Sequence, residues 1–239
     1  MPIPKIVPAK IDAISLLSQD ILKIILRLPP GRKFEFIEGQ YIDLIGPEGI
    51  SRSYSLARHC DGMMLELHVR RVIQGQMSNY LFDKAKVGDL LRINGPRGTF
   101  ILRHAPDDDI VFLATGTGIA PIKAMLERIE KMPGELKPKS VKVFWGMRNR
   151  EELYWDPRGL LGDINFKPVL SRADEFWAGA RGHVQDVMLQ NQTNIENIQI
   201  YACGSDAMIR SSQVKAEANG LSKKNFFSDA FVVSGREQD

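Results

Sequence analysis

The stretch IVFLATGTGIAP, residues 110–121, decides the fold of the second half of this chain. Its first five residues are apolar without interruption, which predicts a strand buried on both faces of a parallel sheet. The segment from Thr115 to Gly118 predicts a turn, followed by a helix over residues 121–131. Pro121 suits the first turn of a helix, where its missing N–H would be unpaired anyway. Glycines in such a turn let a pyrophosphate approach the backbone N–H groups.

The spacing of this turn departs from the G-x-G-x-x-G of a Rossmann fingerprint, because Pro121 occupies the last position. A lone G-x-G is equally typical of a plain connection between a strand and a helix. The surrounding segments alternate: strands are predicted at residues 141–145, 166–170, 198–202 and from 226, and helices at 150–155, 184–190 and 206–218. Such alternation predicts an α/β domain with a doubly wound parallel sheet.

The first half of the chain has a different pattern. Short β-rich runs end at Gly/Pro turns, which predicts strands at residues 21–28, 41–45, 52–57, 63–70 and 90–94. Only residues 78–86 have a helical pattern. Closely spaced strands of this kind predict an N-terminal antiparallel β-barrel. A polar joint near Pro106 divides the chain into expected domains at residues 1–105 and 106–239.

Composition narrows the class of protein. The chain is 44% hydrophobic and 26% charged, which is ordinary for a globular protein. Its net charge of +3 is too small to indicate a nucleic-acid-binding protein. Cys60 and Cys203 are the only cysteines, so a cluster held by four thiolates is excluded for this sequence. The histidines are scattered, and we expect no metal site. Without an apolar stretch of ~20 residues, we expect a cytoplasmic protein with no membrane partner.

The tetrapeptide Arg52-Ser53-Tyr54-Ser55 is the main candidate for ligand binding in the first half. The arginine can bind phosphate oxygens in a bidentate manner. In a strand Arg52 and Tyr54 share one face, so Tyr54 could lie against a flat ring system while Ser55 reaches a ring nitrogen. A surface strand with a β-forming tyrosine is the alternative interpretation. A second phosphate receptor is predicted at Gly75-Gln76-Met77-Ser78, where a glycine turn opens a helix, although a plain serine N-cap would give the same pattern.

The order of motifs along the whole chain resembles the ferredoxin–NADP⁺ reductase superfamily. The motifs are GQY at 39–41, RSYS at 52–55, GQMS at 75–78, GPRG at 95–98, TGTGIAP at 115–121, WGMR at 145–148 and YACGS at 201–205. Residues 52–57, 68–72 and 225–231 are most similar to the flavin and NADH portion of CDP-6-deoxy-hexulose-3-dehydrase reductases and of oxygenase reductases. Those reductases also carry a plant-type [2Fe–2S] module, for which this sequence lacks the cysteines.

The resemblance implies a flavin-binding barrel, a nicotinamide-nucleotide-binding α/β domain, and the cofactors FAD and NADH, with NADPH as the alternative donor. It implies a flavin-dependent NAD(P)H oxidoreductase that passes electrons to a separate one-electron acceptor, such as a ferredoxin or another iron–sulfur protein. Two other functions stay open: a free flavin or quinone reductase, and a nucleotide-sensing subunit without catalysis.

The same resemblance assigns the site residues. Those expected to bind FAD are Arg52, Ser53, Tyr54, Ser55, His68, Val69, Arg70, Gly75, Gln76, Met77, Ser78 and Phe231. Those expected to bind the nicotinamide nucleotide are Thr115, Gly116, Thr117, Gly118, Pro121, Arg148, Ser171, Arg172, Cys203, Gly204 and Met208. The residues expected at the reacting rings are Ser55, Cys203 and Asp229.

Several of these residues have a structural alternative. Cys203, at the end of a strand, is implied to position the nicotinamide, but a small buried thiol is the plain interpretation. Asp229 is implied to lie near the reactive edge of the flavin, and Phe231 is implied to cover the face of its ring. The alternative is that both residues simply belong to a strand at the edge of the sheet. Arg148 and Arg172 are candidate partners of a 2′-phosphate, whereas residues 177–184 resemble NADH-using relatives.

Overall fold

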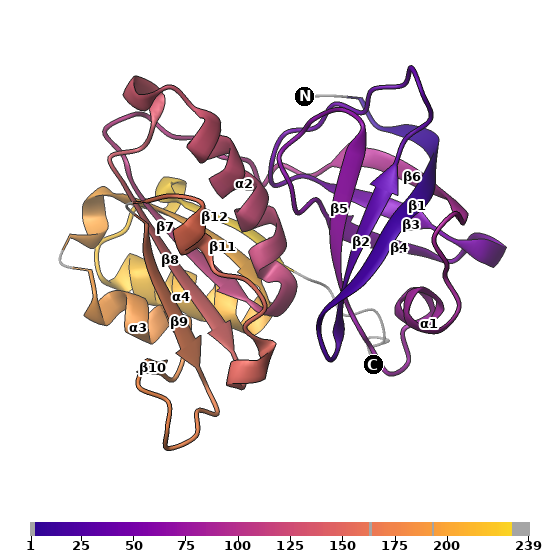
Figure 1. Cartoon of the computed structure of the whole chain (residues 1–239). Helices are drawn as coiled ribbons and strands as arrows, with labels where there is room; N and C mark the ends of the chain where they lie inside the picture. The colour runs from indigo at the N-terminus through magenta and orange to yellow at the C-terminus, as the bar shows by residue number, and fades with distance from the viewer. Residues whose placement is uncertain (1–2, 163, 193, 231–239) are drawn as a thin grey trace, which may run out of the picture. The chain divides into compact units, whose positions relative to one another are not determined.

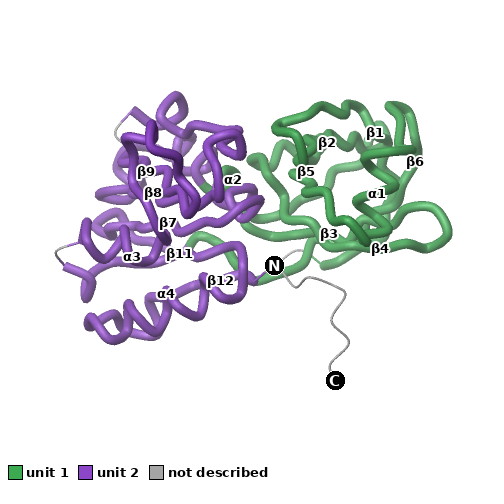
Figure 2. Tube along the Cα trace, turned by 90° about the horizontal axis from the view of Figure 1, so that it is seen from below, with its two compact units in different colours: residues 1–102, 123–125 green, residues 103–122, 126–239 purple. Residues whose placement is uncertain are grey.

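The computed structural model describes residues 3–162, 164–192 and 194–230. The chain forms two compact units, shown in different colours in Figure 2. The first comprises residues 1–102 and 123–125, and the second comprises residues 103–122 and 126–239. Within the described residues, no helix has the length and apolar composition needed to cross a bilayer.

The first unit is an antiparallel barrel. Its strands are β1 (Lys5–Ser18), β2 (Ile21–Arg27), β3 (Tyr41–Ile45), β4 (Ser51–Ser55), β5 (Met64–Arg70) and β6 (Leu90–Arg97). They pair in the order β4-β3-β6-β1-β2-β5, and the bridge between Leu56 and Leu67 closes the sheet. Alternating residues fill the interior, as in β2, where Ile24 and Leu26 are buried while Lys23 is only partly covered. The one α-helix that lies wholly within the described part of this unit is α1 (Gln76–Asp83).

The second unit is a parallel sheet with helices on both faces. Its strands are β7 (Asp109–Thr115), β8 (Ser140–Met147), β9 (Asn165–Leu170), β10 (Ala180–Arg181), β11 (Ile198–Gly204) and β12 (Phe226–Ala230), in the order β10-β9-β8-β7-β11-β12. Its helices are α2 (Ile119–Lys131), α3 (Val184–Gln190) and α4 (Asp206–Ala218). Figure 1 shows α2 on one side of this sheet and α3 and α4 on the other.

The predicted fold class is confirmed in both units, and so is the continuous burial of residues 110–114. The strand order reverses between β7 and β11, which makes their carboxyl ends the place where ligands bind in open α/β sheets. Two helix predictions need correction. Residues 150–155 form only a 3₁₀ turn at Arg150–Glu152, and α1 begins at Gln76 and ends at Asp83.

Candidate active site

Strand β4 places Arg52 and Tyr54 on the same face, as the alternation of a strand predicted. Tyr54 is largely covered and packs against the hydrophobic core of the barrel. Burial raises the pKa of its phenol well above the ordinary value, so the hydroxyl stays protonated, and the nearby Arg52 only partly offsets this shift. The result is an aromatic side chain beside a guanidinium, which suits a flat ring attached to a phosphate.

The two serines of the tetrapeptide differ. Ser53 is exposed, and its hydroxyl donates to Asp43 Oδ1 at 2.7 Å across the β3–β4 pair. Ser55 is buried at the end of β4 and pairs with Tyr41. The hydroxyl of Ser53 therefore already has a partner in the protein, and that partner, Asp43, was missed in the sequence.

Strand β5 carries the expected His68, Val69 and Arg70. The His68 ring is buried and bonded to Glu66 Oε1 at 2.9 Å, and burial lowers the pKa of its imidazole. Val69 belongs to the barrel core, and Arg70 Nε donates to Asp20 Oδ2 at 3.2 Å. The side chains of His68 and Val69 are therefore structural, and these two residues can meet a ligand only through their backbone.

The start of α1 is a turn that only glycine can close. A Cβ on Gly75 would lie 2.6 Å from Ser78 Oγ and 2.9 Å from the Val72 Cβ. Ser78 Oγ accepts the Val72 N–H at 3.1 Å and also reaches the carbonyls of Val72 and Gly75, so this hydroxyl is used inside the turn. Met77 is buried in the core, and Gln76 is exposed.

The α1 turn lies beside the hairpin that carries Arg52. A Cβ on Gly46, in the β3–β4 connection, would be 3.1 Å from Met77 Cε, so α1 packs directly on this hairpin. The strand that carries Arg52 and the helix that begins at the Gly75 turn thus belong to two elements of the first unit that pack on each other. A guanidinium and a glycine turn at the start of a helix are the donors that a pyrophosphate requires, and the residues present fit FAD.

In the second unit, the predicted turn after β7 is a 3₁₀ turn, Gly116–Gly118, that leads into α2. A Cβ on Gly118 would lie 2.1 Å from the Cys203 carbonyl oxygen, and a Cβ on Gly204 would lie 2.2 Å from Thr115 Oγ1. Gly204 also has a φ of +142°, and the Ser205 N–H donates to Thr115 Oγ1 at 3.0 Å. The carboxyl ends of β7 and β11 are therefore in backbone contact, and glycine is required on both sides.

The other residues of the turn are also fixed in place. The Gly116 carbonyl accepts the indole N–H of Trp145 at 2.9 Å, a brace from β8 that the sequence did not reveal. Thr117 is partly exposed, and Pro121 is buried in α2. The backbone of this turn is held by these contacts and lined by glycine at the switch point of the sheet, which fits the pyrophosphate of a dinucleotide.

Cys203 and Asp229 are paired in register on the adjacent parallel strands β11 and β12. Cys203 is completely buried, and burial together with Asp229 raises the pKa of its thiol well above the usual range. Burial also raises the pKa of Asp229 to about 6. The thiol is therefore neutral and suited to packing against a ring, not to nucleophilic attack.

The remaining expected residues do not all lie together. Arg148, Ser171 and Arg172 lie together where β8 and β9 end, because the Arg172 N–H donates to the Arg148 carbonyl at 2.9 Å. Met208 is instead buried in the core of the second unit, where its sulfur accepts the Ser212 hydroxyl at 3.4 Å. Phe231 lies outside the described residues.

Comparisons with known proteins agree with these two half-sites. Residues 8–101 match the family model of an oxidoreductase FAD-binding domain, and residues 112–214 match that of an oxidoreductase NAD-binding domain. The chain is 41% identical over 235 residues to a CDP-6-deoxy-L-threo-D-glycero-4-hexulose-3-dehydrase reductase of Yersinia pestis, covering 96% of this chain and 70% of that protein. It is 32% identical to reductase component 1 of a terephthalate 1,2-dioxygenase of Comamonas sp., covering 95% of this chain and 68% of that protein.

Solved structures show the same fold. An Amycolatopsis cytochrome P450 reductase superposes with a TM-score of 0.86 at 27% identity, covering 95% of this chain and 70% of that one. The fold and the matched domains define an FAD-dependent NAD(P)H oxidoreductase. The chain belongs to the ferredoxin reductase-like family that includes these dehydrase and dioxygenase reductases, which confirms the resemblance seen in its motifs.

Proposed function

We propose that this protein takes electrons from a reduced nicotinamide nucleotide and delivers them singly to a ferredoxin or another iron–sulfur protein. FAD, when bound, supplies the chemistry that converts a two-electron donor into one-electron steps. The observation that carries the proposal is the presence of two compact glycine turns, each leading into a helix, one at Gly75 in the barrel unit and one at the β7–β11 switch point. Relatives described as reductase or electron transfer components support the direction of electron flow.

In the first unit, we assign Arg52 and the turn at Gly75 to the pyrophosphate of FAD. Tyr54 offers its ring face to the flavin, and Ser55 donates a hydrogen bond to the redox-active ring nitrogen. Tyr54 is suited to this role because its ring packs against the core of the barrel, and its phenol is uncharged at neutral pH. Ser53, His68 and Val69 contribute through the backbone, since their side chains are already engaged or buried.

In the second unit, we assign the turn from Thr115 to Gly118 to the pyrophosphate of the nicotinamide nucleotide. Cys203 and Gly204 form the floor on which the nicotinamide rests, and Asp229 lies next to that floor. NADH is the donor we expect. Arg148 and Arg172 are both exposed and adjacent, so a 2′-phosphate would meet them if NADPH is used as well.

The electron acceptor is proposed from chemistry. The two cysteines of these 239 residues cannot ligate a cluster that needs four thiolates. One of them, Cys203, is also buried. The iron–sulfur centre that receives the electrons must therefore lie outside this sequence, and we place it in a separate cytoplasmic protein.

Anaerobic stopped-flow reduction tests the proposal. The purified yellow protein is mixed with NADH or NADPH, the released flavin is identified, and a ferredoxin is then added as acceptor. We expect FAD, rapid bleaching by NADH, and faster turnover with the ferredoxin. Rapid reduction of free flavin without any gain from ferredoxin would instead indicate a flavin reductase. A bound flavin that NADH and NADPH both fail to bleach would indicate a sensor.

A further inference from the structure

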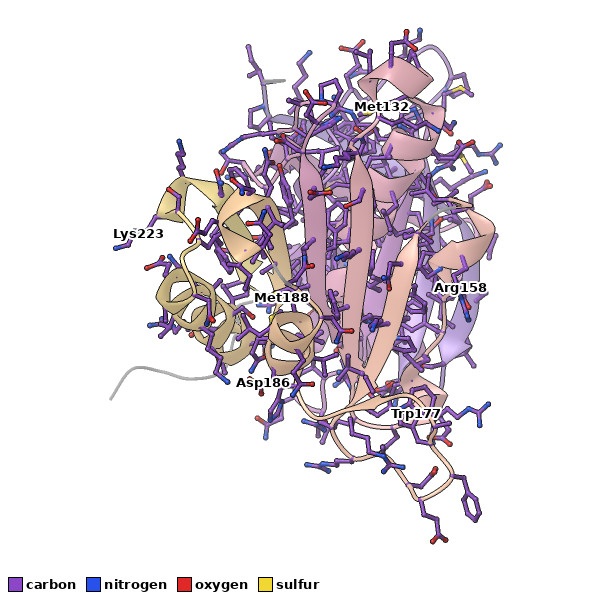
Figure 3. All side chains as sticks on the ribbon, turned by 90° about the vertical axis from the view of Figure 1, so that its left-hand side faces the viewer. Met132, Arg158, Trp177, Asp186, Met188 and Lys223 are labelled. Carbon is purple, nitrogen blue, oxygen red and sulfur yellow. The ribbon has the colours of Figure 1, made fainter. Side chains whose placement is uncertain are left out.

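One arginine makes most of the side-chain hydrogen bonds that are described for the loop between β9 and β10. Arg181 lies on β10, and its guanidinium donates to a series of carbonyls in the preceding loop. The acceptors are Ala173 at 3.2 Å, Asp174 at 2.7 Å, Glu175 at 3.4 Å and Trp177 at 2.8 Å. Figure 3 shows the loop, with Trp177 labelled, extending beyond one end of the sheet. A surface loop braced in this way has a defined backbone.

The side chains of the two aromatic residues in this loop, Phe176 and Trp177, differ in exposure. Trp177 folds inward: its Nε1–H donates to the Ala180 carbonyl at 2.9 Å, and its indole lies against Gly179, where a Cβ would be only 2.5 Å from Cζ2. Phe176 has its N–H fixed by Asp174 Oδ1 at 2.9 Å, but its side chain is 84% exposed. The loop therefore presents one bare aromatic ring on a fixed backbone.

The loop that carries this ring lies at the carboxyl ends of the strands, where ligands bind in open α/β sheets. The loop begins at Ser171, whose N–H donates to the Met147 carbonyl at the end of β8, and it ends where the Gly182 N–H donates to Leu170 at the end of β9. The pyrophosphate turn follows β7, two strands away, a lateral distance of about 10 Å at the usual strand spacing. A dinucleotide with its nicotinamide over β11 and β12 must extend its other end across β8 toward β9.

We infer that Phe176 is the platform on which the adenine of the nicotinamide nucleotide stacks. The inference rests on the proposed function and specifies the adenosine end of the same site. An aromatic face accepts a base by stacking, which needs no particular hydrogen bond. Among the described residues, Arg148 and Arg172 form no ion pair and remain available to the phosphates and ribose, whereas Arg181 is committed to the loop.

Binding of fragments tests the inference without turnover. The purified holoprotein is titrated calorimetrically with ADP-ribose, which contains the adenine, and with reduced nicotinamide mononucleotide, which lacks it. For Phe176→Ala we expect the Kd of ADP-ribose to rise about five- to tenfold, the lower range for loss of a stacked base. The Kd of the mononucleotide should not change, and Phe176→Tyr should restore ADP-ribose binding. Val214→Ala is the matched control, because Val214 is 68% exposed on α4 at another part of the unit.

Kinetics give a second readout. Phe176→Ala should raise the KM for NADH and leave the limiting rate of flavin reduction unchanged, since the contact is remote from the reacting ring. Equal ADP-ribose affinity in Phe176→Ala and the wild type would overturn the inference and leave the proposed function intact. A Phe176→Ala variant that only reduces a ferredoxin more slowly would overturn the inference as well, because the ring would then contact the partner protein and not the adenine. A wild-type protein that binds neither fragment and is not reduced would instead refute the proposed function.

Discussion

Asp229 should make the stability of the second unit fall as the pH rises through the mildly acidic range. Burial raises the pKa of this carboxyl from 3.8 to about 6, whereas in the unfolded chain it titrates at its ordinary value. A raised carboxyl pKa means that the folded state favours the protonated form. The stability it provides is complete below about pH 4 and is lost as the pH rises through about 6.

The magnitude follows from the size of the shift. A difference of about two pKa units corresponds to about 3 kcal/mol in the free energy of unfolding, at 1.36 kcal/mol per unit. Asp229 is only partly buried, so solvent screening reduces this, and we expect about 1–3 kcal/mol. Asp229→Asn mimics the protonated carboxyl and cannot ionise. The variant should therefore match the wild type near pH 4 and exceed its stability by about 1–3 kcal/mol at pH 7.5.

Tryptophan fluorescence provides the assay. All three tryptophans, Trp145, Trp155 and Trp177, belong to the second unit, so urea unfolding followed at this signal reports that unit. Titration of Asp156, whose pKa is lowered chiefly by its hydrogen bond from Arg158, acts in the opposite direction but is common to both proteins and cancels in the difference. Asp107→Asn, at an exposed position, is the control. A stability difference between Asp229→Asn and the wild type that stays constant from pH 4 to 7.5 would refute the reasoning.

Three further predictions concern the two half-sites. Arg52→Ala should weaken FAD retention roughly tenfold or more, the effect of losing hydrogen bonds to a charged group, and should affect FMN retention much less; equal losses for both would remove the pyrophosphate role. Gly118→Ala should lower the free energy of unfolding of the second unit by about 3 kcal/mol or more, because the new Cβ would lie 2.1 Å from the Cys203 carbonyl oxygen. Gly159→Ala is the control: its Cβ would have no atom within 4 Å, so the free energy of unfolding in the same urea assay should change by less than about 0.5 kcal/mol. Cys203→Ser should keep the flavin bound but slow its reduction by NADH in stopped flow. An increase of about 1.4 kcal/mol in the activation barrier corresponds to a roughly tenfold slower rate. An unchanged rate would argue against contact between Cys203 and the nicotinamide.

Features contained in a short stretch of sequence were predictable. Residues 110–121 hold a buried strand, a glycine turn and a helix start in one continuous segment, and the structure has all three. Strand β1 was missed, although it is the longest strand described. Pro8 lies inside it, and two irregularities in its pairing with β2 break the alternation of buried and exposed residues after Ile11. Its long pairing with β6 depends on distant residues, which a local pattern does not contain.

The requirement for glycine at the nucleotide turn illustrates what the sequence does not contain. The sequence suggests that Gly116 and Gly118 open the turn to a phosphate. The structure gives Gly118 another reason, because the Cys203 backbone occupies the space of its side chain. That contact exists only because β11 lies next to β7 in the sheet, and strand order is a long-range property. The expected role of Met208 depends on the same kind of information, since its position on α4 directs it into the core.

Side-chain assignments in the tetrapeptide depend on register in the same way. The alternation of a strand predicts that Arg52 and Tyr54 share a face, and this is how β4 presents them. It does not predict that Asp43 is opposite Ser53, because that depends on the pairing of β3 with β4. Since the Ser53 hydroxyl already donates to Asp43, we expect a ligand on this strand to depend on the side chains of Arg52 and Tyr54 more than on that of Ser53. Selection at position 53 should therefore act on β3–β4 pairing, whereas selection at 52 and 54 should act on the cofactor.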